Sequence, residues 1–271
     1  MSTFHLNNGM KLYYESHGKG TETLVMMHGW ASDHTVFEES IPILRKKARC
    51  IVYDHRGHGG SKNANLEPVS IKTLASDLHE LITGLNLSNI TLFGWSMGAA
   101  TAMAYVRDFG CDALKQLVLC DMTPRLLNDS TWKLGLYKGR FTVADIKRTA
   151  GMDVSEFFQE FVTEAKPVLG KLPDMMLKPL LRTYLSNYDS YTLNILSTDM
   201  KKADFRSAIE KITVPLTYIY AEPGTLFSPA LARWYRSHVH VPFHSVGITK
   251  STHMLVNEHP ALLAEALSRL F

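Results

Sequence analysis

The chain has 271 residues, of which 45% are hydrophobic and 20% are charged. This composition is typical of a folded globular protein and excludes a disordered, fibrous or membrane-embedded one. The formal net charge is only +3 and the basic residues are dispersed, so we expect neither nucleic acid nor a membrane as a partner. The length suits a single α/β core that carries an inserted segment.

The cysteines and the first residues indicate the compartment. Cys50, Cys111 and Cys120 are widely separated and lie in or beside apolar runs, which predicts free buried thiols. The N-terminal residues lack the basic and apolar regions of an export signal, and no apolar run approaches the ~18 residues of a membrane span. We therefore expect a cytoplasmic protein without a membrane anchor.

The predicted elements alternate between strands and helices. The first is a β-hairpin, because Asn8-Gly9 tolerates positive φ and is flanked by strand-like segments. Apolar runs typical of buried parallel strands follow, at residues 24–27, 50–53, 90–95, 117–120, 216–220 and 243–248. Helical patterns cover residues 35–47, 70–85, 97–109 and 229–237, and a last helix starts at 258. This order predicts an α/β fold with a mostly parallel sheet covered by helices on both faces.

Residues 122–204 interrupt the alternation. They show helical periodicity and several prolines but few strand patterns. We interpret them as a helical lid inserted after the sixth strand, with the core formed by residues 1–121 and 205–271. Most of the large apolar side chains of the insertion would form its own small core. Some would line an apolar substrate pocket if the insertion covers the strand ends.

The strongest motif is Gly94-Trp95-Ser96-Met97-Gly98, which stands between an apolar strand and a helical segment. A serine on such a sharp turn has a strained backbone, which leaves room only for small residues two positions away on each side. The turn would lift the hydroxyl of Ser96 above the sheet, where it can act as a nucleophile. The amide of Met97, at the helix N-terminus, would face the negative charge that develops on a substrate oxygen.

With three further motifs, this turn resembles the α/β-hydrolase fold family over essentially the whole chain. His28-Gly29-Trp30 is similar to the family's oxyanion turn, which implies that the amide of Trp30 is the second donor to the oxyanion. Residues 54–61, Asp-His-Arg-Gly-His-Gly-Gly-Ser, match a loop that braces the floor of the site, so we expect structural roles for His55 and His58. Ser251-Thr252-His253-Met254 resembles the family's late histidine loop.

His253 is the candidate general base among twelve histidines. It follows the last expected strand and precedes the terminal helix, where the family's order of serine, acid and histidine places the base. In this role it would take the proton of Ser96 during the attack and return it to the leaving group.

The acid partner of the histidine does not follow the usual pattern. In most relatives an aspartate stands three residues after the small residue that ends the strand, and here that position is Gly224. We favour Asp121, which ends the strand after the elbow helix, where haloalkane dehalogenases and some other relatives have their acid. Glu222 is the alternative, on the expected loop but two residues early, and a serine–histidine dyad is a third. The acid orients the imidazole, so its loss slows the reaction without abolishing it.

The predicted function is that of a serine hydrolase, cleaving a small or medium carboxylic ester through an acyl-enzyme on Ser96, with no cofactor and no metal. The resemblance includes small carboxylesterases that act on pimeloyl-acyl-carrier-protein methyl ester, so the substrate is a small-molecule ester or one bound to a carrier protein. A haloalkane dehalogenase is disfavoured because it needs a carboxylate at position 96. Three alternatives stay open: a carbon–carbon bond hydrolase, a cofactor-free haloperoxidase-like enzyme, and a ligand-binding protein with an inert triad.

Overall fold

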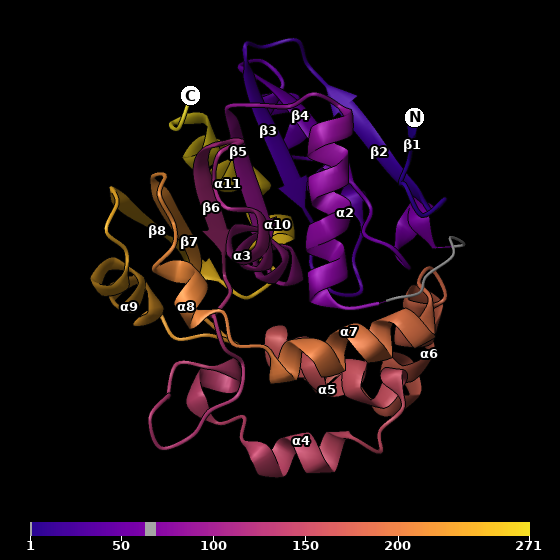
Figure 1. Ribbon diagram of the computed structural model, residues 1–271. Helices are drawn as coiled ribbons and strands as arrows, with labels where there is room; N and C mark the ends of the chain where they lie inside the picture. Colours follow the sequence, from indigo (N-terminus) through magenta and orange to yellow (C-terminus); the bar gives the residue numbers. More distant parts are fainter. Residues whose placement is uncertain (1, 63–68) are drawn as a thin grey trace.

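The computed structural model describes residues 2–62 and 69–271. In this part of the chain a single eight-stranded sheet forms the centre of the molecule, in the order β1-β2-β4-β3-β5-β6-β7-β8 (Figure 1). The strands are β1 (Ser2–His5), β2 (Lys11–His17), β3 (Glu22–Met27), β4 (Ala48–Tyr53), β5 (Ile90–Trp95), β6 (Leu114–Cys120), β7 (Leu216–Pro223) and β8 (Phe243–Ser251). The pairs β1–β2 and β2–β4 are antiparallel and the other pairs are parallel. The predicted mostly parallel α/β sheet is confirmed.

Helices cover both faces of this sheet. The helices that pack on one face are α2 (Ile71–Gly84), α3 (Met97–Phe109), α8 (Arg206–Ile209) and α9 (Leu231–His238). Those on the other face are α1 (Ile41–Leu44), α10 (Leu255–Glu258) and α11 (Pro260–Ser268). Because both faces are covered, every residue of β5 is buried, which explains why its sequence is apolar except for Thr91, whose hydroxyl accepts a hydrogen bond from Gln116.

Two predicted local features are confirmed and one is wrong. The hairpin forms, with Gly9 at φ 81° in its turn, and all three cysteines are buried and free. The helix expected over residues 35–47 is instead a 3-10 turn, η1 (His34–Phe37), followed by the short α1. Pro42 explains the break, because it has no N–H to donate to residue 38 in a continuous helix, whereas it is tolerated in the first turn of a new one.

The chain between β6 and β7 is helical. Besides α8, its helices are η3 (Leu136–Gly139), α4 (Val143–Thr149), α5 (Val154–Ala165), η4 (Leu169–Lys171), α6 (Asp174–Leu185) and α7 (Ser190–Lys202). Figure 1 shows this segment beyond the end of the sheet to which the arrow of β3 points. The two ends of this segment lie side by side where it joins the rest of the chain. Arg125 and Asp204 form an isolated antiparallel bridge there, and the amide of Phe205 donates to the carbonyl of Pro124 (2.8 Å).

None of the helices in residues 2–62 and 69–271 combines the length and the apolar character that crossing a bilayer requires.

Candidate active site

The turn that carries Ser96 joins β5 directly to α3. Ser96 has φ 55° and ψ −118°, a conformation that side-chain-bearing residues rarely adopt. A Cβ added to Gly94 would lie 2.3 Å from the carbonyl oxygen of Gly98, and one added to Gly98 would lie 2.3 Å from that of Met27. The close approach of strand, turn and helix therefore requires both glycines, in agreement with the steric reason for the motif.

Three of the predicted side chains meet at the carboxyl edge of the sheet. The hydroxyl of Ser96 lies 2.9 Å from Nε2 of His253, and Nδ1 of His253 lies 2.7 Å from Oδ2 of Asp121. The side chains of His253 and Asp121 are each only 2% exposed. Because a carboxylate accepts hydrogen bonds, Nδ1 carries the proton and Nε2 is left to accept the proton of the serine hydroxyl.

Asp121 is fixed between two strands. It follows β6 at φ 42°, its amide donates to the carbonyl of Ile219 (2.8 Å), and its Oδ1 accepts a hydrogen bond from the amide of Ala221 (3.1 Å). The second carboxylate oxygen is thereby aimed at the imidazole. Glu222, the other candidate acid, is exposed at the end of β7, and no hydrogen bond joins it to His253.

Gly224, where most relatives carry the acid, is a tight turn in this chain. Its φ is +75°, and a Cβ there would lie 2.5 Å from the carbonyl oxygen of Phe227. The backbone thus leaves no room for a carboxylate side chain at this position, and the imidazole takes its partner from the end of β6 instead.

Two residues that position His253 were not singled out from the sequence. The hydroxyl of Thr225 accepts a hydrogen bond from the amide of His253 (3.0 Å) and donates to the carbonyl of Ala165 at the end of α5 (2.7 Å). The indole of Trp95 donates to the carbonyl of His253 (3.0 Å). Trp95 stands directly before Ser96 in the elbow motif, so its closeness to the site could be expected from the sequence. Nothing in the sequence indicated a role for Thr225.

The two predicted oxyanion donors lie beside the serine. Met97 is the first residue of α3, where the helix leaves its amides without intrahelical acceptors. Trp30 lines the same cavity as Ser96, while its indole donates to the carbonyl of Leu193 in α7 (2.9 Å). Within the part of the chain that the structure describes, neither amide donates to a backbone carbonyl in a turn or loop.

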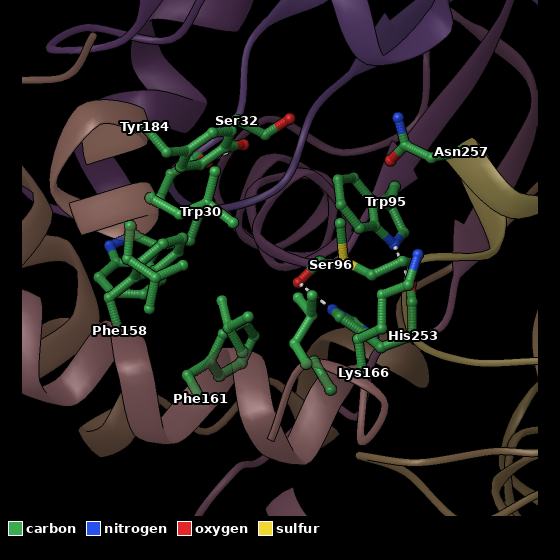
Figure 2. Close-up of a pocket in the computed structure, with 17 residues that line it drawn as sticks. Trp30, Ser32, Trp95, Ser96, Phe158, Phe161, Lys166, Tyr184, His253 and Asn257 are labelled. Carbon is green, nitrogen blue, oxygen red and sulfur yellow. Dashed lines mark hydrogen bonds between the residues drawn. The ribbon is translucent and has the colours of Figure 1, made fainter. Parts of the chain in front are cut away.

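Ser96 faces two cavities of unequal size. The larger has a volume of about 360 Å³, is mainly apolar, and is also lined by His253 (Figure 2). The smaller has a volume of about 30 Å³ and is lined by Ser96 but not by His253. Trp30 and Phe161 line both. The other residues around the smaller cavity are Met122, Leu126, Leu136, Phe157, Ser197, Met200, Lys201 and Phe227.

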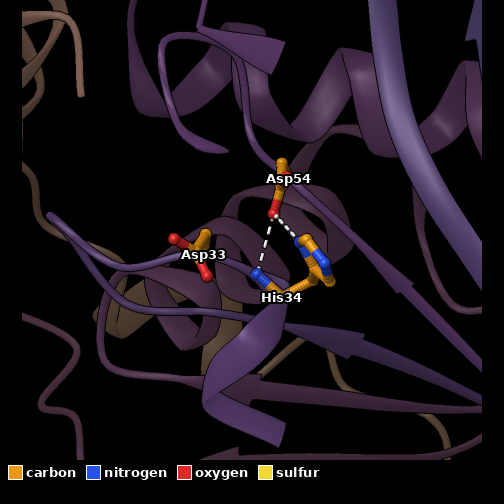
Figure 3. Close-up of side chains that lie close together, drawn as sticks. All are labelled: Asp33, His34 and Asp54. Carbon is orange, nitrogen blue, oxygen red and sulfur yellow. Dashed lines mark hydrogen bonds and ion pairs between the residues drawn. The ribbon is translucent and has the colours of Figure 1, made fainter. Parts of the chain in front are cut away.

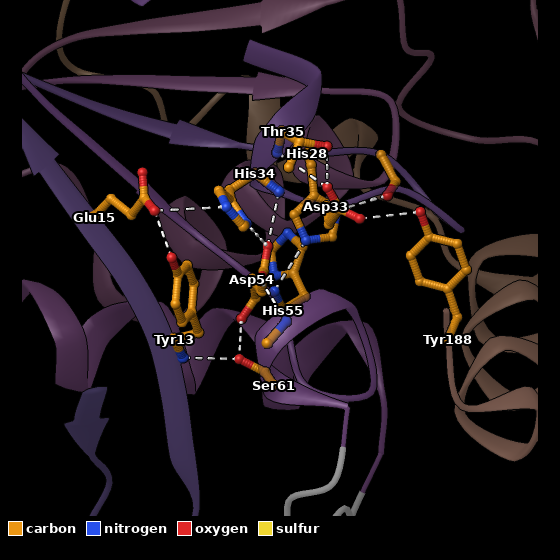
Figure 4. A network of polar contacts seen from close by, with 12 residues as sticks. Tyr13, Glu15, His28, Asp33, His34, Thr35, Asp54, His55, Ser61 and Tyr188 are labelled. Carbon is orange, nitrogen blue, oxygen red and sulfur yellow. Dashed lines mark hydrogen bonds and ion pairs between the residues drawn. The ribbon is translucent and has the colours of Figure 1, made fainter. Parts of the chain in front are cut away.

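A polar cluster near β4 is the one group among the described residues with the composition of a metal site. The ligand atoms of Asp33, His34 and Asp54 lie within 4.8 Å of one another (Figure 3). Hydrogen bonds already use them: Oδ1 of Asp54 accepts from the amide and lies 2.8 Å from Nδ1 of His34, and Oδ2 accepts from the amide of Gly60. Burial disfavours the charged form of His34, but the hydrogen bond to Asp54 and the negative charges of Asp54, Glu15 and Asp33 together outweigh burial and raise the pKa of His34. The arrangement is that of a network that ties loop 54–61 to η1 (Figure 4).

Three histidines are buried behind the turn that contains Trp30. Burial lowers the pKa of His28, that of His55 strongly, and that of His58 to about 3, so all three are neutral at pH 7. Nε2 of His28 accepts from the amide of His55 (3.0 Å), and Nδ1 of His58 donates to the carbonyl of Arg56 (3.0 Å). Their burial and these backbone hydrogen bonds agree with the structural roles that we expect for His55 and His58.

The site contains a serine on a strand-to-helix turn, and this serine contacts an imidazole that a carboxylate orients. These features define a class of protein: the α/β hydrolases. A family model described as the alpha/beta hydrolase fold matches residues 22–232, and the chain belongs to this family. The resemblance stated from the motifs is confirmed.

Individual relatives carry different names within this family. The pimeloyl-(acyl-carrier protein) methyl ester esterase of Nitrosomonas europaea is 23% identical, over 84% of this chain and 87% of its own. The Karrikin insensitive 2 receptor B of Petunia hybrida is 23% identical, over 83% of each chain. Among solved structures, this chain is similar to the bromoperoxidase from Bacillus anthracis, with 26% sequence identity and a TM-score of 0.80. The match covers 96% of this chain and 94% of that one.

Proposed function

We propose that this protein is a serine hydrolase that cleaves a small or medium carboxylic ester through an acyl-enzyme on Ser96. The hydrogen-bonded series from Ser96 through His253 to Asp121, at 2.9 and 2.7 Å, carries this proposal. It supplies a nucleophile, a base within proton-transfer distance and an orienting carboxylate beside a mainly apolar cavity. The ester-hydrolysing relative from Nitrosomonas europaea supports an ester as the substrate.

The reaction proceeds in two halves. Oγ of Ser96 attacks the ester carbonyl while its proton moves to Nε2 of His253, and the amides of Trp30 and Met97 stabilise the oxyanion. The bond between the carbonyl carbon and the alcohol oxygen breaks, and the imidazolium returns the proton to the departing alcohol. A water then attacks the acyl-enzyme, gives one proton to His253, and the serine leaves with that proton as the carboxylic acid is released.

In this proposal residues 122–204 form a lid over a core made of residues 1–121 and 205–271. Three contacts attach the lid helices to the turn that carries Trp30. The hydroxyl of Tyr184 donates to the carbonyl of Ala31 (2.8 Å), that of Tyr188 lies 3.2 Å from Oδ2 of Asp33, and the indole of Trp30 bonds α7. The lid therefore covers the serine and supplies apolar walls such as Phe158 and Phe161.

The enzymatic alternatives share the serine and histidine but differ in substrate. The bromoperoxidase relative keeps a haloperoxidase-like activity as the second candidate. An inert binding protein is less favoured, because the hydrogen bonds from serine to histidine and from histidine to aspartate both have productive lengths.

A fluorophosphonate probe tests the proposal. We expect it to label the wild-type protein at Ser96, and Ser96→Ala to lose both the label and the hydrolysis of p-nitrophenyl esters. Ser237→Ala, which changes an exposed serine on α9, is the matched control and should behave as wild type. Unchanged ester hydrolysis in Ser96→Ala would contradict the assignment.

A further inference from the structure

The smaller cavity beside Ser96 contains a buried lysine. Lys201 is the second-last residue of α7, is only 7% exposed, and lines this cavity together with Ser96. Its Nζ donates to the hydroxyl of Thr149 (3.2 Å) and lies 3.4 Å from the centre of the Phe157 ring. The rest of the cavity lining is apolar apart from the hydroxyls of Ser96 and Ser197.

No carboxylate of residues 2–62 or 69–271 lies within ion-pair distance of Lys201. Glu160 acts on the lysine only at longer range, and both its carboxylate oxygens accept hydrogen bonds from Arg148, at 2.6 and 2.9 Å. Burial lowers the pKa of Lys201 to about 8, which leaves the amine mostly protonated at neutral pH. A desolvated ammonium without an anion is unfavourable, and an anionic ligand in the cavity would relieve that cost.

The position of His253 indicates which part of an ester substrate binds in each cavity. The alcohol oxygen must lie near His253 when it takes the proton, and His253 lines the larger cavity. The smaller cavity, reached from Ser96 and not lined by His253, is left for the acyl chain. Its volume of about 30 Å³ matches a group the size of roughly one or two water molecules, as a carboxylate is.

We propose that Lys201 binds a carboxylate at the far end of a short acyl chain. The substrate class is then a monoester of a short dicarboxylic acid with a larger apolar alcohol. This inference rests on the proposed ester hydrolysis at Ser96 and adds to it the acyl specificity. Thr149 and the Phe157 ring position the ammonium, so that the two remaining N–H groups of Nζ are free for the carboxylate.

Two esters of the same alcohol test the inference. Monobenzyl succinate carries the carboxylate and benzyl butyrate carries a methyl group in its place, and released benzyl alcohol is measured for both. We expect kcat/KM of the wild type to be higher for monobenzyl succinate by about 10- to 100-fold, the range for a buried charge-assisted hydrogen bond. Lys201→Met should lose this preference, measured as the ratio of kcat/KM for the two esters, while Lys202→Met, at the exposed next position, should keep it.

The outcomes separate this inference from the proposed function. Hydrolysis of benzyl butyrate at least as fast as that of monobenzyl succinate, or a preference that survives in Lys201→Met, overturns the anion site and leaves the hydrolase intact. Hydrolysis of neither ester overturns the inference, and failure of the fluorophosphonate to label Ser96 overturns the hydrolase as well. If Lys201→Met does not fold, competition in the wild type decides, because succinate should inhibit benzyl butyrate hydrolysis and neutral succinamide should not.

Discussion

Asp121 sits in a backbone conformation that few side chains adopt, and both of its carboxylate oxygens are engaged. We predict that Asp121→Asn lowers kcat by about 10³- to 10⁴-fold, because an amide favours the wrong imidazole tautomer and cannot stabilise the imidazolium. Glu222→Gln, which changes an exposed carboxylate, is the matched control and should stay within about twofold of wild type. Steady-state hydrolysis of a p-nitrophenyl ester measures both. Equal, small losses would point to a dyad.

The same residue shows how far the sequence could determine the site. Ser96 and His253 follow from local motifs, because a strand, a turn and a helix in succession fix where the serine points. The acid depends on how the ends of β6 and β7 align and on the tight turn at Gly224, which are properties of the folded sheet. Lys201 was one of many lysines in the sequence, and only its burial distinguishes it.

At the scale of elements, the hydroxyl of Thr225 connects the histidine loop to α5. We predict that Thr225→Val, which keeps the shape and removes the hydroxyl, lowers kcat by about tenfold, because the imidazole loses its fixed position. Thr225→Ser, which keeps the hydroxyl, should retain most of the activity. The comparison of kcat between the two variants is the measurement, and equal rates would show that the connection does not position His253.

Elements were predicted well where one pattern dominates. The segments 90–95 and 97–109 coincide with β5 and α3, because burial on both sides makes the strand mostly apolar and the elbow ends it. The helix over 35–47 failed because its apolar spacing continues through Pro42, whose missing N–H matters more than the pattern.

For the whole molecule, the buried ion pair of Arg56 with Asp77 connects loop 54–61 to α2, at 2.6 and 2.7 Å. We predict that Asp77→Ala lowers the free energy of unfolding by about 3–5 kcal/mol, because it removes the carboxylate from a guanidinium that stays buried. Urea unfolding followed by circular dichroism measures this. Asp112→Ala, at an exposed position, is the control, and a loss below about 1 kcal/mol in Asp77→Ala would contradict the argument.

The buried histidines make stability depend on pH. The pKa of each of His28, His55 and His58 lies below the ordinary value of 6.5, so the unfolded chain binds protons first as the pH falls. The contribution of these three histidines to the free energy of unfolding is constant above pH 6.5. It is lost progressively as the pH falls below 6.5, down to about pH 3 for His58. His34 has a raised pKa and acts in the opposite sense, but it is one group against three.

We therefore predict that the free energy of unfolding decreases between pH 6.5 and pH 4.5, and that His58→Gln decreases this slope. His5→Gln, at an exposed position, should leave the slope unchanged. Urea titrations at several pH values give the measurement. A slope in His58→Gln equal to that of wild type would show that this histidine does not contribute.

The bridge between Arg125 and Asp204 has a consequence for how such a protein diversifies. Since the intervening chain leaves the sheet and returns to it at adjacent positions, we expect that it can be exchanged as one segment. Replacing it with the equivalent stretch of a relative alters the walls that face the substrate, including Lys201 and Phe161, while the nucleophile, its base and its acid remain on the unchanged scaffold. Part of the substrate selectivity would then be encoded apart from the reacting residues, although Trp30 and Phe227 line the two cavities from outside this segment.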